Sequence, residues 1–321
     1  MKDYLNYTGD FSKLSRKDLE YLFILLQQYQ LKYRDTLGLD ERISFGTELE
    51  FEHVLLYYVK KEMSKNSLFK DWFVHEDKSC SYKIDGFEVG GEVSSPILHD
   101  TKLDWHILSE VILTLQKLKA HVTDNTSLHV HVGAQIFGEE IKNVIRFIKV
   151  WCIFEAVIFK FAYGKSSTPR SKILDFAHPI AEETLFKSFY SLDIEAIIHP
   201  KEFAFDKTKA VNFNNYHYLS NSEEINHTIE IRCANGLLQR NMIQNTINFY
   251  LKLMLYVTSD QYDEQLINRL FARLKVKDFS TYQNIYIKDA LLLADLIFDN
   301  SLNKINFLKQ YVKKDEVVFV R

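Results

Sequence analysis

The sequence predicts an α+β fold, in which a curved, mainly antiparallel β-sheet carries helices on one face. Short segments with alternating apolar and polar residues lie between longer segments with helical periodicity. These segments do not follow the regular βαβ order that produces a doubly wound parallel sheet. Ten Gly and four Pro in 321 residues leave few breaks, which favours continuous regular structure.

The first helix is predicted over residues 15–37. Ser15, with Asp18 three positions later, resembles a capping box, and Gly38 suits a left-handed residue after the helix. Gly164 likewise suits the end of a long helix that begins near residue 139. The polar segment 165–180 holds half of the prolines and is expected to be a loop. Further helices are expected at residues 104–120, 139–163, 181–190, 237–258, 262–275 and 285–298.

Composition and charge limit the classes of function. A hydrophobic content of 46% supports a sizeable core, and a net charge of −3 without a basic run argues against nucleic-acid binding. The most apolar stretch, residues 143–163, contains four charged residues, so we expect a buried helix and no membrane span. The N-terminus shows no signal-peptide pattern. Three cysteines without a C-x-x-C pair suggest a reduced, cytoplasmic location.

Residues 43–52, ISFGTELEFE, alternate strictly and predict a strand with one apolar and one acidic face. The acidic face carries Glu48, Glu50 and Glu52. A solvated sheet face is the simplest interpretation of such a strand in isolation. However, glutamate is a poor strand former, and like charges about 7 Å apart repel one another. A cation between the carboxylates would reverse that repulsion.

Four further strands are predicted at residues 87–95, 127–133, 209–214 and 227–233. Each has one apolar face, and the opposite faces carry Glu88 and Glu92, His129 and His131, Asn212 and Asn214, and Glu230 and Arg232. Carboxylates and imidazoles without a thiol suit Mg²⁺ or Mn²⁺. An arginine beside such metals suggests phosphate, whose oxygens match the guanidinium fork. Since no GxxxxGK[ST] loop is present, these features predict a nucleotide site on a sheet face.

The order of several short motifs resembles the amidoligase family of ATP-dependent carboxylate–amine ligases. The motifs, over residues 43–258, are FGTELEFE, WFVHEDKS, GGEVSSPIL, TSLHVHVGA, SSTPR, VNFNN and TIEIRCANGLL. The resemblance implies a fold like that of glutamine synthetase and glutamate–cysteine ligase. No break in composition divides the chain, so we expect one catalytic domain over residues 1–321, with an N-terminal helical extension (1–40) and a C-terminal helical segment (260–321). Two departures are Ser171, where the family often doubles the arginine, and Leu237, where it has threonine.

The resemblance also implies roles for individual residues. Glu48, with His129 and Glu230, would hold a metal near the β- and γ-phosphates, and Glu50 with Glu92 would hold one near the substrate carboxylate. Arg232 would act on the transferring γ-phosphoryl group, which makes Arg232, Glu48 and Glu230 the expected catalytic residues. The residues expected to contact the nucleotide are His131, Arg170, Asn212 and Arg232.

Structural alternatives stand beside these roles. Strand histidines are commonly structural, and Arg232 could simply pair with Glu230. Arg170 could be an ordinary loop charge, and Asn212 could cap a strand end. Glu52 could bind a third metal or lie at the rim. The family's D-x-S turn is matched by Asp77 and Ser79, which an Asx-type turn explains nearly as well; Cys233 faces the apolar side and is expected in the core.

The expected activity is an ATP- and Mg²⁺- or Mn²⁺-dependent ligase that joins a carboxylate to an amine through an acyl phosphate. Its partners would be an amino acid or peptide carrying the carboxylate and an amine co-substrate, and a homo-oligomer is possible. A metal-dependent hydrolase is the main alternative, since an H-x-H pair with carboxylates also binds zinc. A phosphotransferase of related fold and a non-catalytic binding subunit are the others.

Overall fold

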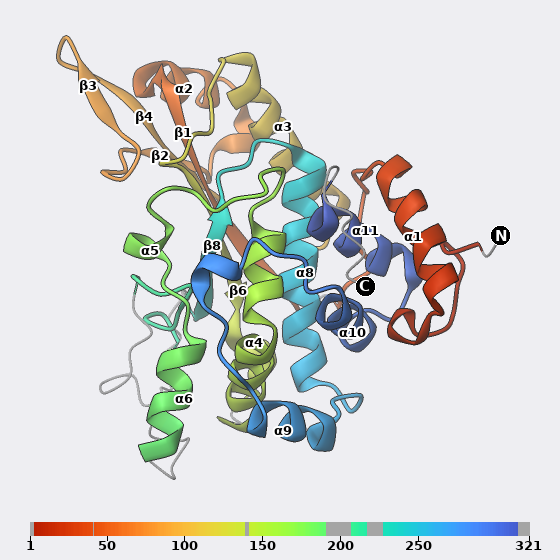
Figure 1. The fold of residues 1–321 in the computed structure, drawn as a ribbon. Coiled ribbons are helices and arrows are strands. Elements are labelled where there is room, and N and C mark those ends of the chain that lie inside the picture. Colours follow the sequence, from red (N-terminus) through yellow and green to blue (C-terminus); the bar gives the residue numbers. More distant parts are fainter. Residues whose placement is uncertain (1–2, 41, 139–140, 191–206, 217–226, 314–321) are drawn as a thin grey trace.

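The structure is a computed structural model, and it describes residues 3–40, 42–138, 141–190, 207–216 and 227–313. The described residues form helices and one antiparallel sheet, which confirms the predicted α+β class with a mainly antiparallel sheet (Figure 1). The likeness to the glutamine synthetase fold stays a prediction.

The sheet contains eight strands in the order β2-β4-β1-β6-β8-β7, with β3 paired to β4 and β5 paired to β1. Every strand pair is antiparallel. The strands are β1 (Ser44–Leu55), β2 (Phe73–His75), β3 (Tyr82–Ile84), β4 (Phe87–Ser94), β5 (Leu98–His99), β6 (Ser127–Gly133), β7 (Val211–Asn212) and β8 (Thr228–Asn235). All five predicted strands are present in this sheet, although β7 is shorter than residues 209–214. The alternation did not reveal β2, β3 and β5, because two or three residues are too few to show a period.

Every predicted helix has a counterpart, and α2, α5 and α11 were not predicted. The helices are α1 (Arg16–Gln28), α2 (Leu56–Met63), α3 (Lys102–Lys117), α4 (Ile141–Ala162), α5 (Ile173–Phe176), α6 (Ala181–Tyr190), α8 (Arg240–Thr258), α9 (Glu264–Ala272), α10 (Ile287–Ile297) and α11 (Ser301–Val312). Short 3₁₀ turns form η1 (Phe11–Lys13), η2 (Ser67–Phe69), η3 (Ala134–Phe137) and η4 (Phe279–Thr281). The segment 165–180, expected to be a loop, therefore contains one helical turn, α5.

The prediction for the first helix was right at its start and wrong at its end. The Ser15 side chain accepts a hydrogen bond from the backbone N–H of Asp18, as the capping box predicts. The helix ends at Gln28, nine residues before residue 37. Beyond it, the backbone N–H groups of Leu37 and Leu39 donate to the two carboxylate oxygens of Asp100. These tertiary bonds take the place of helical ones, and Gly38, at φ +71°, lies between the two leucines, well beyond the end of the helix.

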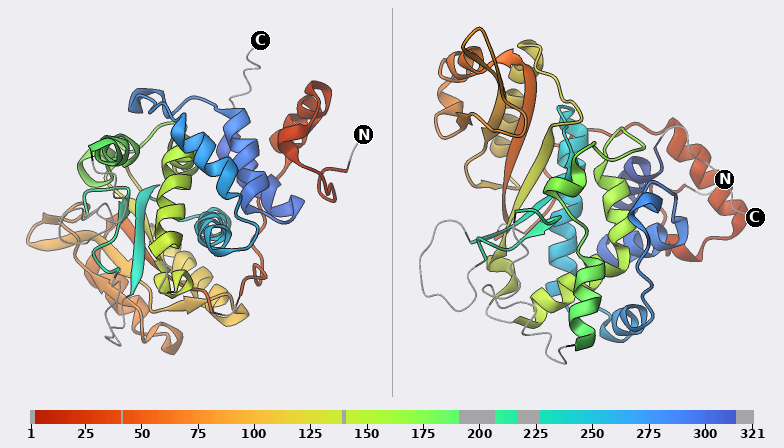
Figure 2. Two further views of the ribbon diagram at one scale, coloured as in Figure 1. Left: turned by 90° about the horizontal axis from the view of Figure 1, so that it is seen from below. Right: turned by 60° about the vertical axis from the view of Figure 1, so that its left-hand side comes forward.

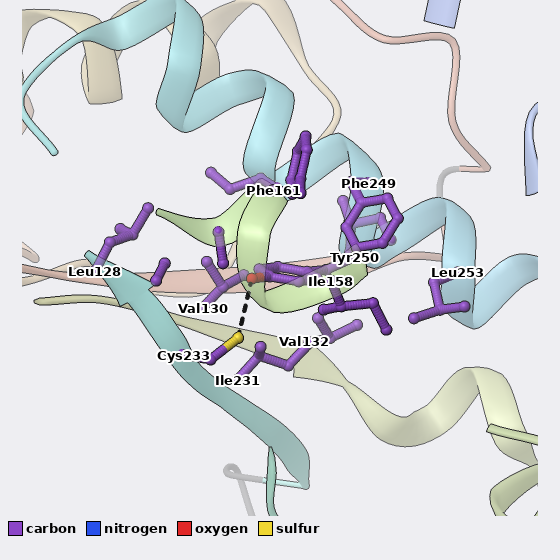
Figure 3. Close-up of a cluster of buried hydrophobic side chains, with 14 of the residues drawn as sticks. Leu128, Val130, Val132, Ile158, Phe161, Ile231, Cys233, Phe249, Tyr250 and Leu253 are labelled. Atoms are coloured by element: carbon purple, nitrogen blue, oxygen red, sulfur yellow. Dashed lines mark hydrogen bonds between the residues drawn. The ribbon is translucent and has the colours of Figure 1, made fainter. Parts of the chain in front are cut away.

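The apolar face of the sheet packs against α4 and α8. Figure 3 shows Leu128, Val130 and Val132 of β6 beside Ile231 of β8, facing aromatic and aliphatic side chains of the two helices. Cys233 belongs to this layer, as predicted; it is fully buried, with its sulfur 3.6 Å from the Tyr250 hydroxyl. Full burial of each such aliphatic or aromatic side chain stabilises the fold by roughly 1.5–3 kcal/mol. The polar side chains of these strands lie on the opposite face of the sheet, away from α4 and α8.

The terminal helices form further layers behind α4 and α8. In the views of Figures 1 and 2, α10 and α11 lie on the far side of this helix pair from the sheet, with α1 beyond them. Helix α11 contacts both α4 and α8, and α1 contacts α11. One connected set of buried hydrophobic side chains runs from Tyr4 to Val312. None of the described helices combines the length and apolar character that crossing a membrane requires.

Candidate active site

The register of the sheet brings the predicted polar residues together. Across β1 and β6, Glu48 lies opposite His129, and across β6 and β8, His131 lies opposite Glu230. Across β1 and β4, Glu50 lies opposite Glu92. Directly opposed side chains in an antiparallel pair lie close enough to interact. Residues from four strands therefore form one carboxylate–histidine cluster on the polar face, comprising Glu48, Glu50, Glu92, His129, His131 and Glu230.

Glu48 is the centre of this cluster. Its Oε2 lies 2.8 Å from His129 Nδ1, and its Oε1 lies 3.0 Å from His131 Nε2. Burial alone would raise the pKa of the Glu48 carboxyl, but the hydrogen bonds to the two histidines outweigh burial and hold it well below its ordinary value. Burial also acts to lower the pKa of His131, yet its contact with Glu48 and the neighbouring carboxylates raise it. The two histidines therefore bind the ionised form of Glu48.

Glu50 and Glu92 form the second part of the cluster. Glu50 is 3% exposed and accepts hydrogen bonds from the backbone N–H and the hydroxyl of Ser127, at 2.7 and 2.5 Å. Glu92 accepts a hydrogen bond from Ser94 and lies 3.1 Å from His75 Nε2. Burial, together with the negative charge of Glu48, raises the pKa of Glu92 to about 7. Two buried carboxyl groups are thus held where a cation would favour their ionised form.

Glu230 and Arg232 lie side by side on β8 and contact one another. An Arg232 guanidinium N–H donates to Glu230 Oε1, and the Arg232 Nε donates to the Phe176 carbonyl at 3.3 Å. The pairing considered as a structural alternative for Arg232 is therefore present. Asn212 donates to Glu230 Oε2 at 2.6 Å and accepts from the Asn214 backbone N–H. Asn212 thus orients Glu230 and also serves in the turn at the strand end.

Three other sequence-predicted positions lie around this cluster. Glu52 accepts a hydrogen bond from Asn125 at 3.1 Å and belongs to neither carboxylate–histidine group that could hold a metal among the described residues. Asp77 accepts from the backbone N–H and the hydroxyl of Ser79, which is the Asx-type turn. Arg170 is buried, and its backbone N–H donates to Asn235.

The cluster offers two overlapping sets of metal ligands. Glu48, His131 and Glu230 form one set, and Glu48, Glu92 and His129 form the other, with the donor atoms of each set within 4.8 Å of one another. Burying several carboxylates without a cation is costly, because each loses its hydration. Oxygen and imidazole donors without a thiol suit Mg²⁺ or Mn²⁺. The donor set and its burial therefore fit the predicted metals.

Comparison with known proteins identifies the family of the chain. Residues 42–254 match the model of a protein family whose description is "Putative amidoligase enzyme". The chain belongs to the amidoligase family. This match confirms the resemblance drawn from the motifs and supports a ligase enzyme. The matched segment contains all the residues of the cluster. No curated protein matches the chain.

Two cavities adjoin the amidoligase cluster, although the sequence predicted one site on one sheet face. We call the first, of about 260 Å³, the neutral cavity; its lining includes Glu48 and His131, and the rest of it is uncharged. The second, of about 440 Å³, is the charged cavity, and it includes Glu50, His129 and Arg232. Alternation assigns Glu48 and Glu50 to the same face of the sheet, but it does not show that they line different cavities on that face.

Two site residues of this amidoligase were not predicted from the sequence. His75 on β2 lies opposite Glu92 and contacts it, but β2 has three residues and gives no periodic signal. Ser127 binds Glu50 and also lies 2.8 Å from His129 Nε2. Ser127 shares the alternation of His129 and His131, so its place on the polar face was available from the sequence.

Proposed function

We propose that the chain is an ATP- and Mg²⁺-dependent ligase, also served by Mn²⁺, that joins a carboxylate to an amine through an acyl phosphate. One observation carries this proposal: a buried carboxylate–histidine cluster beside Arg232 on one sheet face, in a chain of the amidoligase family. The glutamine synthetase-like layout is part of the proposal. The acid is an amino acid or a peptide, and the second substrate is an amine.

The proposed division of the ligands between two metals follows the resemblance; the two groups of close donor atoms instead join His131 to Glu48 and Glu230, and His129 to Glu48 and Glu92. Glu48, with His129 and Glu230, would hold the metal nearer the β- and γ-phosphates of ATP, and Glu50 with Glu92 would hold the metal nearer the acid. When bound, Mg²⁺ neutralises phosphate charge and orients the triphosphate. Glu48 and His131 line the neutral cavity, so we place the nucleotide there. Glu50 lines the charged cavity, where we place the acid.

The proposed reaction has two steps. A carboxylate oxygen of the acid attacks the γ-phosphorus, the bond to the β,γ-bridging oxygen breaks, and ADP leaves. The amine nitrogen then attacks the acyl carbon, the carbon–oxygen bond to phosphate breaks, and the amine loses a proton. Arg232 would stabilise the charge that grows on the γ-phosphoryl oxygens, because its guanidinium is fixed by Glu230 and the Phe176 carbonyl. Water would have to be excluded from the site on the polar face, so that the amine attacks the acyl phosphate before water hydrolyses it.

ADP release distinguishes this proposal from the alternatives. The purified chain would be incubated with ATP, Mg²⁺ and a panel of amino acids, peptides and amines, and products would be analysed by mass spectrometry. A ligase releases ADP and gives an adduct whose mass is the sum of acid and amine less one water. A phosphorylated acid without an adduct would identify a phosphotransferase. Hydrolysis with zinc and no ATP would identify a hydrolase, and either result would overturn the proposal.

A further inference from the structure

Arg170 is a buried cation that forms no ion pair with a described carboxylate, although Glu50 lines the same cavity. The residue is 4% exposed, and one terminal N–H donates to the Arg232 carbonyl at 3.2 Å. Its Nε is buried without a hydrogen-bond partner among the described residues. None of the carboxylates in the described part of the chain forms an ion pair with it. Burying an unpaired charge destabilises a fold, so such a group indicates an anionic ligand.

The two arginines near the cluster differ in this respect. Arg232 contacts Glu230, so its charge is already offset within the protein. Arg170 is fixed at its backbone by Asn235 and at one guanidinium nitrogen by a carbonyl, which holds its position without neutralising its charge. Burial lowers the pKa of Arg170, the negative charge of Glu50 acts against burial, and the nearby Arg232 acts in the same direction as burial. An arginine that is fixed, buried and unpaired is preorganised for a planar anion such as a carboxylate.

The charged cavity around Arg170 carries both signs of charge. Its basic residues are Lys78, Arg170, Lys207 and Arg232, and its acidic residues are Glu50, Glu76, Asp77 and Asp175. A volume of about 440 Å³ lies within the range of small-molecule sites. Anionic and cationic groups in one cavity complement a molecule that also carries both charges.

We propose that Arg170 anchors a carboxylate of the acid substrate, and that the charged cavity takes a zwitterionic acid of the amino-acid class. The ammonium group of this acid lies towards the acidic side chains at the exposed rim, Glu76 and Asp175. This assignment rests on the proposed function, which places the acid on the Glu50 side. It also replaces the expected contact between Arg170 and the nucleotide, because Arg170 and Glu48 line different cavities.

Binding measured by thermal shift separates the two ligands. The full chain would be titrated with Mg²⁺ and a non-hydrolysable ATP analogue, and then, in their presence, with each of the twenty L-amino acids. Every amino acid that raises the Tm would be compared with its carboxamide and its N-acetyl derivative. The variants are Arg170→Met, which keeps the length of the side chain, and Arg170→Lys, which keeps its charge. Lys172→Gln is the control, since Lys172 is exposed and does not line the cavity.

We expect at least one amino acid to raise the Tm of the wild type, and both of its derivatives to bind more weakly. Arg170→Met should weaken that binding about 10- to 100-fold, because a charged hydrogen bond is lost. Its response to the ATP analogue should equal that of the wild type. Arg170→Lys should recover part of the affinity, and Lys172→Gln should behave as the wild type. Without ligand, the Tm of Arg170→Met should equal or exceed that of the wild type, since an unpaired buried charge is removed.

Three results would overturn the assignment. One is an Arg170→Met variant that binds the amino acid as tightly as the wild type. Another is an Arg170→Met variant that no longer responds to the ATP analogue, which would show that Arg170 contacts the nucleotide. The third is a wild type that responds to the analogue but to none of the amino acids. A wild type that neither responds to the analogue nor releases ADP would instead contradict the proposed function.

Discussion

Glu48 and His129 face one another across β1 and β6, with Glu48 Oε2 2.8 Å from His129 Nδ1. The two residues are 81 positions apart in the chain, and each lies on the polar face of its strand. Their contact shows that both alternating segments turn their polar faces the same way. The same face receives Glu230 from β8, whose Oε1 lies 3.4 Å from His129 Nδ1.

Replacement of Glu48 by glutamine should lower ADP release steeply, with partial recovery at high Mg²⁺ or with Mn²⁺. The reason is that Glu48 belongs to both candidate ligand sets, and loss of a charged ligand weakens metal binding. Rates would be measured across metal concentrations. Glu88→Gln is the matched control, because Glu88 lies on β4, pairs with Lys83 and is outside both ligand sets. A Glu48→Gln variant whose activity depends on metal concentration as in the wild type would show that Glu48 is not a metal ligand.

Replacement of Arg232 by alanine should lower kcat by about 10²–10³, with a smaller effect on the KM for ATP. Arg232 is proposed to act on charge that grows only in the transition state, and loss of such a donor has this typical effect. Arg232→Lys should recover little, because lysine lacks the planar fork. Steady-state kinetics would test both variants, with the exposed Arg269→Ala as control. Added Mg²⁺ or Mn²⁺ should not restore the activity of Arg232→Ala. Near-native ADP release by a folded Arg232→Ala variant would contradict the proposed role of Arg232 in phosphoryl transfer.

Gly90→Ala should destabilise the chain far more than Gly38→Ala. Both glycines have positive φ, at +80° and +71°, so alanine at either position carries a backbone penalty of roughly 1–2 kcal/mol. A Cβ at Gly90 would also lie 2.5 Å from the Cys80 carbonyl oxygen, whereas nothing lies within 4 Å at Gly38. Urea unfolding would measure the free energy of unfolding of each variant. Equal losses at the two positions would show that close packing around Gly90 is unimportant.

Glu155 should make the free energy of unfolding fall as pH rises from about 4.5 to 7. Complete burial raises the pKa of this carboxyl to about 7, so the folded chain keeps a proton that the unfolded chain has released. A shift of that size corresponds to a loss on the order of 3 kcal/mol. Glutamine can accept from the Ile180 and Ala181 N–H groups, which donate to Glu155, and it does not titrate.

The Glu155→Gln variant should therefore gain stability relative to the wild type between pH 5 and pH 8. Urea unfolding at four or five pH values would measure the difference between the two chains. Glu20→Gln is the control, since the Glu20 side chain is about half exposed (46%) and forms a surface ion pair with Arg16. A difference that stays constant with pH, or changes in favour of the wild type, would contradict this assignment for Glu155.

The sequence alone determined which residues share a face of the sheet and which face is apolar. The strand period of two places Glu48, His129 and Glu230 on the polar side wherever their strands pair, and it leaves Val130 and Ile231 for α4 and α8. The sequence also predicted contacts between residues that are close in the chain, such as the hydrogen bond from the Asp18 backbone N–H to the Ser15 side chain at the start of α1. The α+β class and the polar cluster could be predicted because both follow from local periodicity.

Only the tertiary structure decided which of these residues touch and what surrounds them. Both histidines bind Glu48 because the register of β1 and β6 sets them beside it, and a period of two does not specify register. Helix α1 ends at Gln28, and the chain beyond it is fixed by Asp100, 61–63 residues away. Arg170 is held in its buried position by hydrogen bonds to Asn235 and to the Arg232 carbonyl, 62–65 residues away. These contacts join distant segments, and their energies depend on packing that no local pattern contains.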